Sequence, residues 1–190
     1  MNSNKKLFIF TVILVALATV SKLAFASNIA WSGFSPVFAI ALFSGMMMAD
    51  NKSKSFLLPL LALLASDVII QILFVAKLFP FEGLYKFQLF NYALLLLSVL
   101  IGWALKAKKI SYIFISVLAA PTVYFLASNF LVWATHGGYS RPITFNGLML
   151  CFADGLPFYK NSLLATIIFL PAITVIYNLL MKKNYSITLA

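Results

Sequence analysis

Long apolar runs constrain this chain more than any other feature of its sequence. A bilayer core about 30 Å thick needs roughly 20 helical residues to cross it. In lipid the backbone polar groups must bond within their own segment, so such runs predict helices rather than isolated strands. We therefore expect an all-α, polytopic membrane protein with a single transmembrane domain, residues 1–190. The six predicted transmembrane helices lie at residues 7–26, 35–49, 56–76, 88–105, 112–135 and 161–181.

The composition excludes several classes of function. Hydrophobic residues make up 63% of the chain and charged residues 9%, which is typical of a membrane protein. The net charge of +10 is spread between the apolar runs instead of forming a basic face, so we expect no nucleic-acid partner. One cysteine and one histidine exclude an internal disulfide, a CxxC pair, bis-histidine haem and the HExxH motif. We expect no cofactor, no metal ion and no enzymatic activity.

The distribution of basic residues predicts the orientation in the membrane. With the N-terminus in the cytoplasm, nine basic residues lie at cytoplasmic helix ends and five at outer ends. Cytoplasmic loops carry an excess of lysine and arginine, so both termini are predicted to be cytoplasmic. The alternative is that the first run is a secretory signal cleaved after Ala24-Phe25-Ala26, which would leave five crossings.

The polar residues of the predicted helices concentrate in their outer halves, whereas the inner halves are mainly aliphatic. Amide, imidazole and carboxylate groups in lipid usually face the bundle interior or a wet cavity. Their convergence at one depth predicts a small-molecule pocket open to the outside, and not a continuous channel. These residues are Asp67 and Gln71 in the third run, Gln88 and Asn91 in the fourth, Asn129, Trp133 and His136 in the fifth, and Asn161 in the sixth.

Structural roles compete with a binding role at several of these positions. Asp67 could pair with a lysine as packing glue between helices, and Trp133 could belong to an interfacial aromatic belt. Asn161 is well placed to be the N-cap of the sixth helix. Arg141 suits a lipid headgroup contact, and Cys151 suits a small buried hydrophobe. A metal site formed by His136, Cys151 and Asp154 is a minor alternative.

The segment at residues 136–160 is too long for a simple connection, and its apolar stretch from Leu148 to Ala153 is too short to cross. Gly155 and Pro157 interrupt its apolar stretch. We therefore expect residues 143–158 to form a short interfacial or re-entrant helix between the fifth and sixth helices. This segment is the predicted lid of the outer pocket, and it adds Tyr139 and Asp154 to the candidate substrate contacts.

Four stretches of the sequence resemble a known family. They are GFSPVFAIALFSG at 33–45, LLPLLALLASD at 57–67, SNFLVW at 128–133 and CFADGLPFYKNSLL at 151–164. They are similar to a group of small bacterial six-helix transport proteins, which in turn resemble the substrate-binding S components of energy-coupling-factor (ECF) transporters. The resemblance implies a location in the bacterial plasma membrane and partners in a coupling subunit with two ATPases. It also implies a substrate role for Asn129, Trp133, Tyr159 and Asn161.

The sequence thus favours a transport protein of the ECF S-component type, which binds a vitamin-like micronutrient or a metal chelate in an outward-facing pocket. The membrane lipid is its other expected contact. The alternative is a non-transport membrane subunit or scaffold of an envelope complex; a membrane enzyme using His136 or Asp154 ranks third. The predicted substrate-binding residues are Asn129, Trp133, His136, Tyr139, Tyr159, Asn161, Asp67, Gln71, Asn91 and Asp154.

Overall fold

The computed structural model describes residues 3–181 except 26, 87, 106–109 and 136–140. Within these residues all regular structure is helical, as predicted, and no strand is present. Five of the helices are long and apolar enough to cross a membrane, which identifies a multi-pass membrane protein. The elements are α1 (Ser3–Phe25), the 3₁₀ turn η1 (Ile29–Trp31), α2 (Val37–Met47), α3 (Lys52–Val75), α4 (Gln88–Leu105), α5 (Ile110–Ala134) and α6 (Phe145–Met181).

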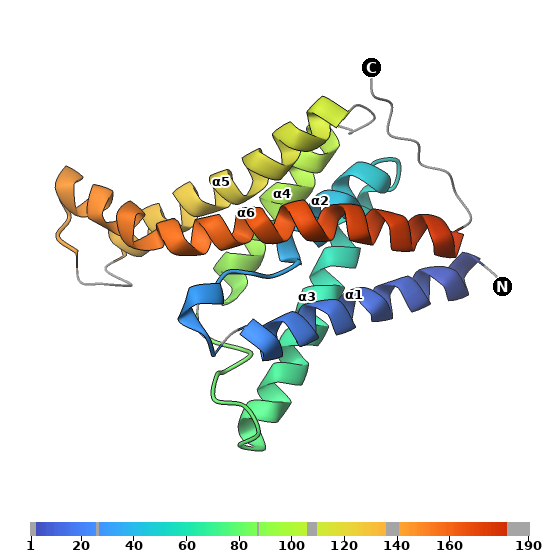
Figure 1. Cartoon of the computed structure of the whole chain (residues 1–190), viewed down its shortest axis with the longest axis horizontal. Helices are drawn as coiled ribbons and strands as arrows, with labels where there is room; N and C mark the ends of the chain where they lie inside the picture. Colours follow the sequence, from blue (N-terminus) through green and yellow to red (C-terminus); the bar gives the residue numbers. More distant parts are fainter. Residues whose placement is uncertain (1–2, 26, 87, 106–109, 136–140, 182–190) are drawn as a thin grey trace.

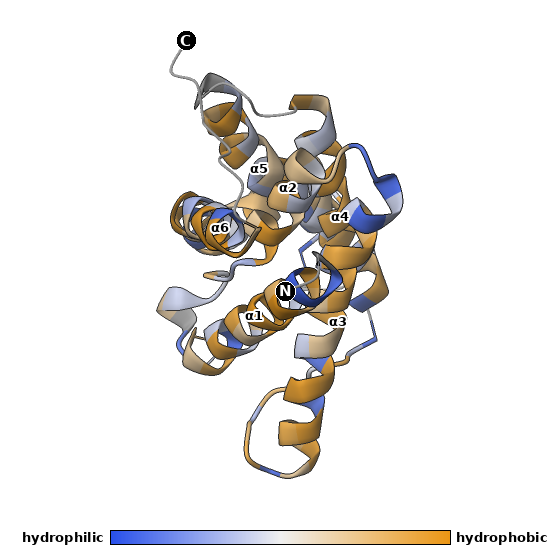
Figure 2. Cartoon of the chain, turned by 90° about the vertical axis from the view of Figure 1, so that its right-hand side faces the viewer, coloured by the Kyte–Doolittle hydropathy of each residue, from blue (hydrophilic) through white to orange (hydrophobic). Residues whose placement is uncertain are grey.

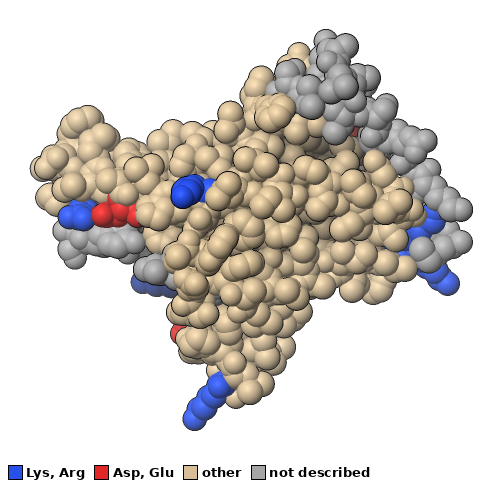
Figure 3. All heavy atoms as spheres, in the orientation of Figure 1, with Lys and Arg blue, Asp and Glu red and all other residues tan. Residues whose placement is uncertain are grey.

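The helices pass back and forth between two ends of the molecule (Figure 1). The start of α1 and the end of α6 lie at the same end of the molecule. Figure 2 shows apolar residues along the helices and hydrophilic residues mainly near helix ends and in connections. On the face seen in Figure 3, charged side chains are few and lie mostly toward the ends of the molecule. The broad uncharged middle fits contact with lipid.

The second predicted crossing is not a membrane-spanning helix by itself. At about 1.5 Å per residue, the 11 residues of α2 extend only about 16 Å. All of its side chains from Phe38 to Ser44 are buried, because α2 packs against α3, α4, α5 and α6. An apolar helix of this length is as compatible with a protein core as with lipid. The sequence pattern therefore predicted a helix correctly but did not distinguish a core helix from a crossing.

The predicted break between a lid helix and the sixth helix is absent. The single helix α6 runs for 37 residues through Gly155 and Pro157, and Figure 1 shows it extending along the whole molecule. Proline removes one backbone hydrogen bond, and a helix inside a bundle tolerates that loss. Pro59 in α3 and Pro121 in α5 are likewise inside helices. At about 55 Å, α6 is longer than a bilayer core about 30 Å thick, so part of it lies outside the hydrocarbon.

Aromatic and aliphatic side chains of α1, α2 and α6 form the core at the end where α1 begins. Phe10 and Phe43 are fully buried. Their ring centroids lie 5.4 Å apart, and each lies within 5.2 Å of the Tyr177 ring. Offset and edge-to-face contacts of this kind add to the stabilisation from apolar burial. This end of the bundle is therefore closed by packed side chains.

Two glycines allow α2 and α4 to approach closely. A Cβ on Gly102 would lie 2.8 Å from the carbonyl oxygen of Leu42 and 3.0 Å from the Cα of Gly45. Both neighbours are backbone atoms, so a side chain cannot be accommodated by rotation of a neighbour. Small residues at helix interfaces are a general means of close packing in membranes.

We expect Gly102→Ala to destabilise the fold by about 1–3 kcal/mol, because α2 and α4 must separate to admit the methyl group. Thermal unfolding in detergent, followed by tryptophan fluorescence, should show a lower Tm. Ala93→Leu is the control, because Ala93 is an exposed residue of the same helix. An equal Tm for wild type and Gly102→Ala would contradict this packing.

Candidate functional site

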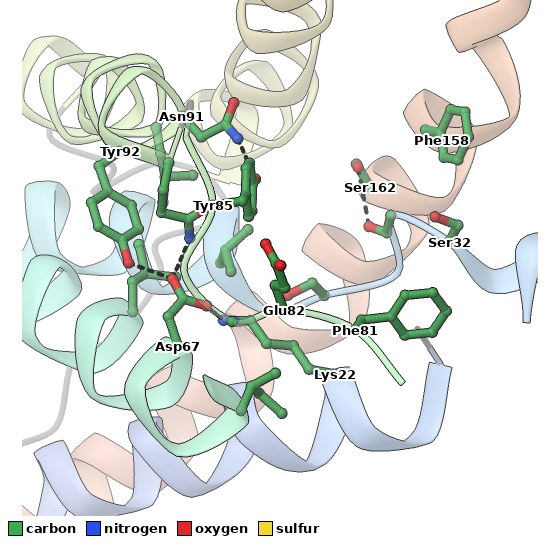
Figure 4. Close-up of a pocket in the computed structure, with 18 of the residues that line it drawn as sticks. Lys22, Ser32, Asp67, Phe81, Glu82, Tyr85, Asn91, Tyr92, Phe158 and Ser162 are labelled. Carbon is green, nitrogen blue, oxygen red and sulfur yellow. Dashed lines mark hydrogen bonds and ion pairs between the residues drawn. The ribbon is translucent and has the colours of Figure 1, made fainter. Parts of the chain in front are cut away.

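A cavity of about 570 Å³ lies between the end of α1, the middle of α3, the first turns of α4 and the segment that precedes α2 (Figure 4). Phe158 and Ser162 of α6 and Tyr124 of α5 complete its wall. The loop at residues 76–86 covers one side through Phe79, Phe81, Glu82, Gly83 and Tyr85. The cavity is therefore at the end of the bundle opposite the start of α1.

Asp67 is the most heavily hydrogen-bonded side chain of the cavity. Its carboxylate forms a salt bridge with Lys22 of α1 and accepts hydrogen bonds from Gln88 and Tyr92 of α4. Lys22 Nζ also donates to Ser66 Oγ at 2.7 Å. The Asp67 side chain is only 4% exposed. A buried carboxylate is strongly unfavourable unless it is paired and hydrogen-bonded, so these donors make its burial possible and join α1, α3 and α4.

The alternatives left open for Asp67 are therefore not exclusive: it pairs with a lysine and also lines the cavity. Lys22, Glu82 and Tyr92 are lining residues that sequence reasoning did not select. A lysine near the end of an apolar helix is a signal that could have revealed Lys22, because a buried ammonium needs a partner. For Tyr92, no comparable signal exists, since a tyrosine within an apolar run is common.

Gln71 holds the covering loop instead of lining the cavity. Its side-chain oxygen accepts hydrogen bonds from the backbone N–H groups of Gly83, at 3.0 Å, and Leu84, at 2.9 Å. Gly83 packs against the backbone of Asp67 and Gln71 so closely that a Cβ there would clash with the Asp67 carbonyl oxygen. A glycine is required by this close approach. The loop is thus fixed to α3 beside the buried carboxylate.

Asn91 lines the cavity, as the sequence predicted, and connects two tyrosines. Its amide nitrogen donates to the Tyr85 hydroxyl, and its oxygen accepts from the Tyr124 hydroxyl at 3.2 Å. Burial raises the pKa of Tyr85 above its usual value of 10.0, an effect partly offset by the Asn91 hydrogen bond. The Tyr85 hydroxyl is therefore protonated and neutral at physiological pH.

Asn161 positions the segment before α2. Its amide nitrogen donates to the carbonyl oxygens of Ala30, at 2.8 Å, and Ser32, at 2.9 Å. Ser162 Oγ donates to the Gly33 carbonyl at 3.1 Å, and Gly33 has a φ of +88°. The N-cap role expected of Asn161 is wrong, because α6 begins at Phe145 and Asn161 is an interior residue of it. Its amide instead fixes a wall of the cavity from α6.

Two predicted residues meet in a second, smaller cavity of about 230 Å³ between α5 and α6. Asn129 and Tyr159 line it, with Gly155 between them in the wall. The two cavities share Tyr124, Phe158 and Ser162 as lining residues. The Tyr159 hydroxyl lies 2.7 Å from Thr122 Oγ1, and Asn129 Nδ2 donates to the Phe125 carbonyl at 2.8 Å. Four residues of the predicted set thus line two adjacent cavities, two residues in each.

Trp133 and Asp154 lie in neither cavity. Trp133 Nε1 donates to the Pro142 carbonyl at 3.0 Å. Arg141 forms two hydrogen bonds with Asp154, at 2.9 and 3.1 Å, so its partner is a carboxylate of its own chain. Both contacts hold the segment that precedes α6.

The remaining expectations concern Cys151, the residues His136 and Tyr139, and the alternative of a metal site. Cys151 is fully buried, as expected of a small hydrophobe. His136 and Tyr139 lie outside the described residues. Among the described residues no group of three His, Cys, Asp or Glu side chains could hold a metal ion.

The fold and cavity thus define a multi-pass membrane protein with a partly polar cavity near one end. Residues 1–188 match the family of unknown function DUF6580, and the chain belongs to this family. No curated protein and no solved structure matches the chain.

We expect Lys22 and Asp67 to be energetically coupled. Asp67→Asn should destabilise the protein by about 3 kcal/mol, because Lys22 and the donors of α4 lose a buried charged acceptor. The double variant with Lys22→Met should cost less than the sum of the single changes by about 1 kcal/mol or more. A double-mutant cycle from SDS denaturation in detergent measures this coupling.

The matched control for that cycle is the pair of Arg141 and Asp154, whose side chains are 34% and 26% exposed. More exposed ion pairs are worth less, so the coupling from Arg141→Met and Asp154→Asn should be smaller. Equal coupling in the two cycles would contradict a special structural role for Asp67.

We expect Gln71→Leu to release the covering loop, because two backbone N–H groups lose their acceptor. Amide hydrogen exchange at Gly83 and Leu84 should accelerate about tenfold or more. Gln88→Leu is the matched control, since Gln88 bonds to Asp67 and not to these amides. Unchanged exchange at both amides in Gln71→Leu would show that something other than Gln71 holds the loop.

Proposed function

We propose that the protein binds a small molecule in the larger cavity as the substrate-binding subunit of a transport system of the ECF S-component type. The observation that carries the proposal is the cavity itself. Its volume of about 570 Å³ falls within the range of small-molecule sites, roughly 300–1,000 Å³. Most of its wall surface is apolar, and several polar groups, Asn91 and Gln88 among them, converge on it.

The orientation of the cavity supports uptake from outside. With both termini in the cytoplasm, as the basic residues predict, the cavity opens toward the exterior. The opposite end of the bundle is filled by α2 and the aromatic core around Phe43. A channel would need polar groups along its whole depth, so binding followed by a conformational step is the better account.

Energy for such transport must come from a partner. The sequence has no phosphate-binding loop of the GxxxxGK[ST] kind, so the chain does not bind ATP in that way. A coupling subunit with ATPases in the bacterial plasma membrane is the proposed partner. A vitamin-like micronutrient or a metal chelate is the proposed class of substrate.

The smaller cavity is proposed as an extension of the same site. It shares three lining residues with the larger cavity and contributes Asn129 and Tyr159. Trp133, Asp154 and Asn161 then act indirectly, by holding the segments that enclose the site. Gln71 acts in the same way through the covering loop.

We expect ligand binding to depend on Asn91. Native mass spectrometry of the purified protein against a panel of vitamins and metal chelates should find at least one retained compound. Asn91→Ala should weaken its binding about tenfold, because a cavity amide that orients Tyr85 and Tyr124 is lost. Asn146→Ala is the matched control, since Asn146 is exposed at the start of α6.

Co-purification and deletion separate this proposal from its alternative. Recovery of a coupling subunit with ATPases supports transport, whereas recovery of an unrelated envelope complex supports a scaffold. Absence of any bound compound, together with unchanged uptake in a deletion strain, would overturn the proposed function.

A further inference from the structure

The larger cavity carries an unbalanced negative charge. Lys22 is the sole cationic side chain among the described residues that line it, and Asp67 pairs with it. Glu82 also lines the cavity, and within the described part of the chain it has no ion pair or hydrogen bond. Figure 4 shows its side chain rising from the covering loop toward Tyr85. A cationic group in the cavity would balance this carboxylate.

The loop that carries Glu82 is held in place before any ligand binds. Gly83, the next residue, donates its backbone N–H to Gln71 and packs on the backbone of Asp67. Leu84 donates to the same amide oxygen. The backbone beside Glu82 is therefore anchored at the cavity edge, and such preorganisation lowers the entropy cost of binding.

Seven aromatic side chains line the same cavity. Phe79, Phe81 and Tyr85 come from the covering loop. Phe38, Tyr92, Tyr124 and Phe158 come from four different helices. Aromatic faces attract cations, and they also stack against flat rings. Because Tyr85 is neutral, its ring and hydroxyl add no competing charge.

One buried acceptor of the wall also lacks a donor. Gln88 donates its side-chain N–H to Asp67, and a carboxylate in a salt bridge can only accept, which fixes the orientation of the amide. The remaining oxygen, Gln88 Oε1, is buried and has no hydrogen-bond partner among the described residues. A buried unsatisfied acceptor is costly, so an N–H group of a ligand would relieve it once the Gln88 side chain turns toward the cavity.

We infer that the ligand of this cavity is an organic cation with a flat ring, that is, an aromatic or heteroaromatic ring that carries a protonated alkylamine. Its positive nitrogen lies against Glu82, its ring lies among the aromatic side chains, and an N–H group donates to Gln88 Oε1 after that side chain turns toward the cavity. This inference rests on the proposed binding function and narrows its substrate class. The N-terminus of α2, beside Val37 and Phe38, is the feature of the wall that would instead favour an anion.

Two matched sets of compounds test which charge the cavity prefers. Within each set the ring is the same, and the attached group is an amine, an alcohol or an acid. They are tryptamine, indole-3-ethanol and indole-3-acetate, and pyridoxamine, pyridoxine and 4-pyridoxate. Dissociation constants are measured with the full-length protein in detergent by native mass spectrometry. We expect the amine of at least one set to bind about tenfold more tightly than its alcohol and its acid.

Two variants test whether Glu82 causes the preference for the amine. Glu82→Gln should abolish the preference for the amine, and Asp50→Asn should leave it intact. Both changes remove one negative charge from the protein, but Asp50 is an exposed residue of the α2–α3 turn outside the cavity. Thermal unfolding in the same detergent confirms that each variant is folded.

The outcomes separate this inference from the proposed function. Tighter binding of the acids, or an amine preference that survives in Glu82→Gln, would overturn the inference while leaving a small-molecule site in place. Equal binding of all members of a set would do the same. Failure of these six compounds and of the vitamin and chelate panel would count against the proposed binding function itself.

Discussion

The buried carboxylate of Asp67 is the constraint on which the arrangement of the cavity depends. In a low-dielectric interior this group must be paired, and its partners come from α1 and α4. Satisfying it brings Lys22, Gln88 and Tyr92 to one point between three helices. The covering loop then packs on the backbone beside it through Gly83. The need to pair this one carboxylate thus fixes the helices that meet at the cavity and the loop that covers one side of it.

The short helix α2 closes one end of the cavity. Its side chains from Phe38 to Ser44 are all buried, and Gly102 of α4 lets it approach closely. The polar segment before α2, held by Asn161, occupies the depth that a full-length helix would have filled. Because α2 is shorter than a full-length transmembrane helix, one end of the bundle is densely packed and the other holds a partly polar space. Such a division suits a protein that binds a solute from one side.

Much of the fold was predictable, because helix formation in lipid depends on local composition. The fourth helix was predicted at 88–105 and is Gln88–Leu105, and the other long helices begin and end within a few residues of expectation, apart from the start of α6. The wrong prediction, a break near Gly155 and Pro157, relied on a rule for isolated helices. In the bundle, Gly155 instead packs on Asn129 of α5, where a Cβ would lie 2.6 Å from Oδ1. Of the predicted site, Asp67 and Asn91 line the larger cavity and Asn129 and Tyr159 the smaller.

The sequence by itself determined the membrane class, the helical fold and the depth at which polar groups gather, because each depends on the composition of contiguous residues. Only the tertiary structure decided which of those groups meet. Lys22 and Asp67 are 45 residues apart, and Asn161 bonds to a carbonyl 131 residues away. Such pairs depend on the rotation and crossing of packed helices, which no local pattern encodes. For the same reason, only the tertiary structure places Glu82 at the edge of the cavity, where it has no ion pair within the described part of the chain.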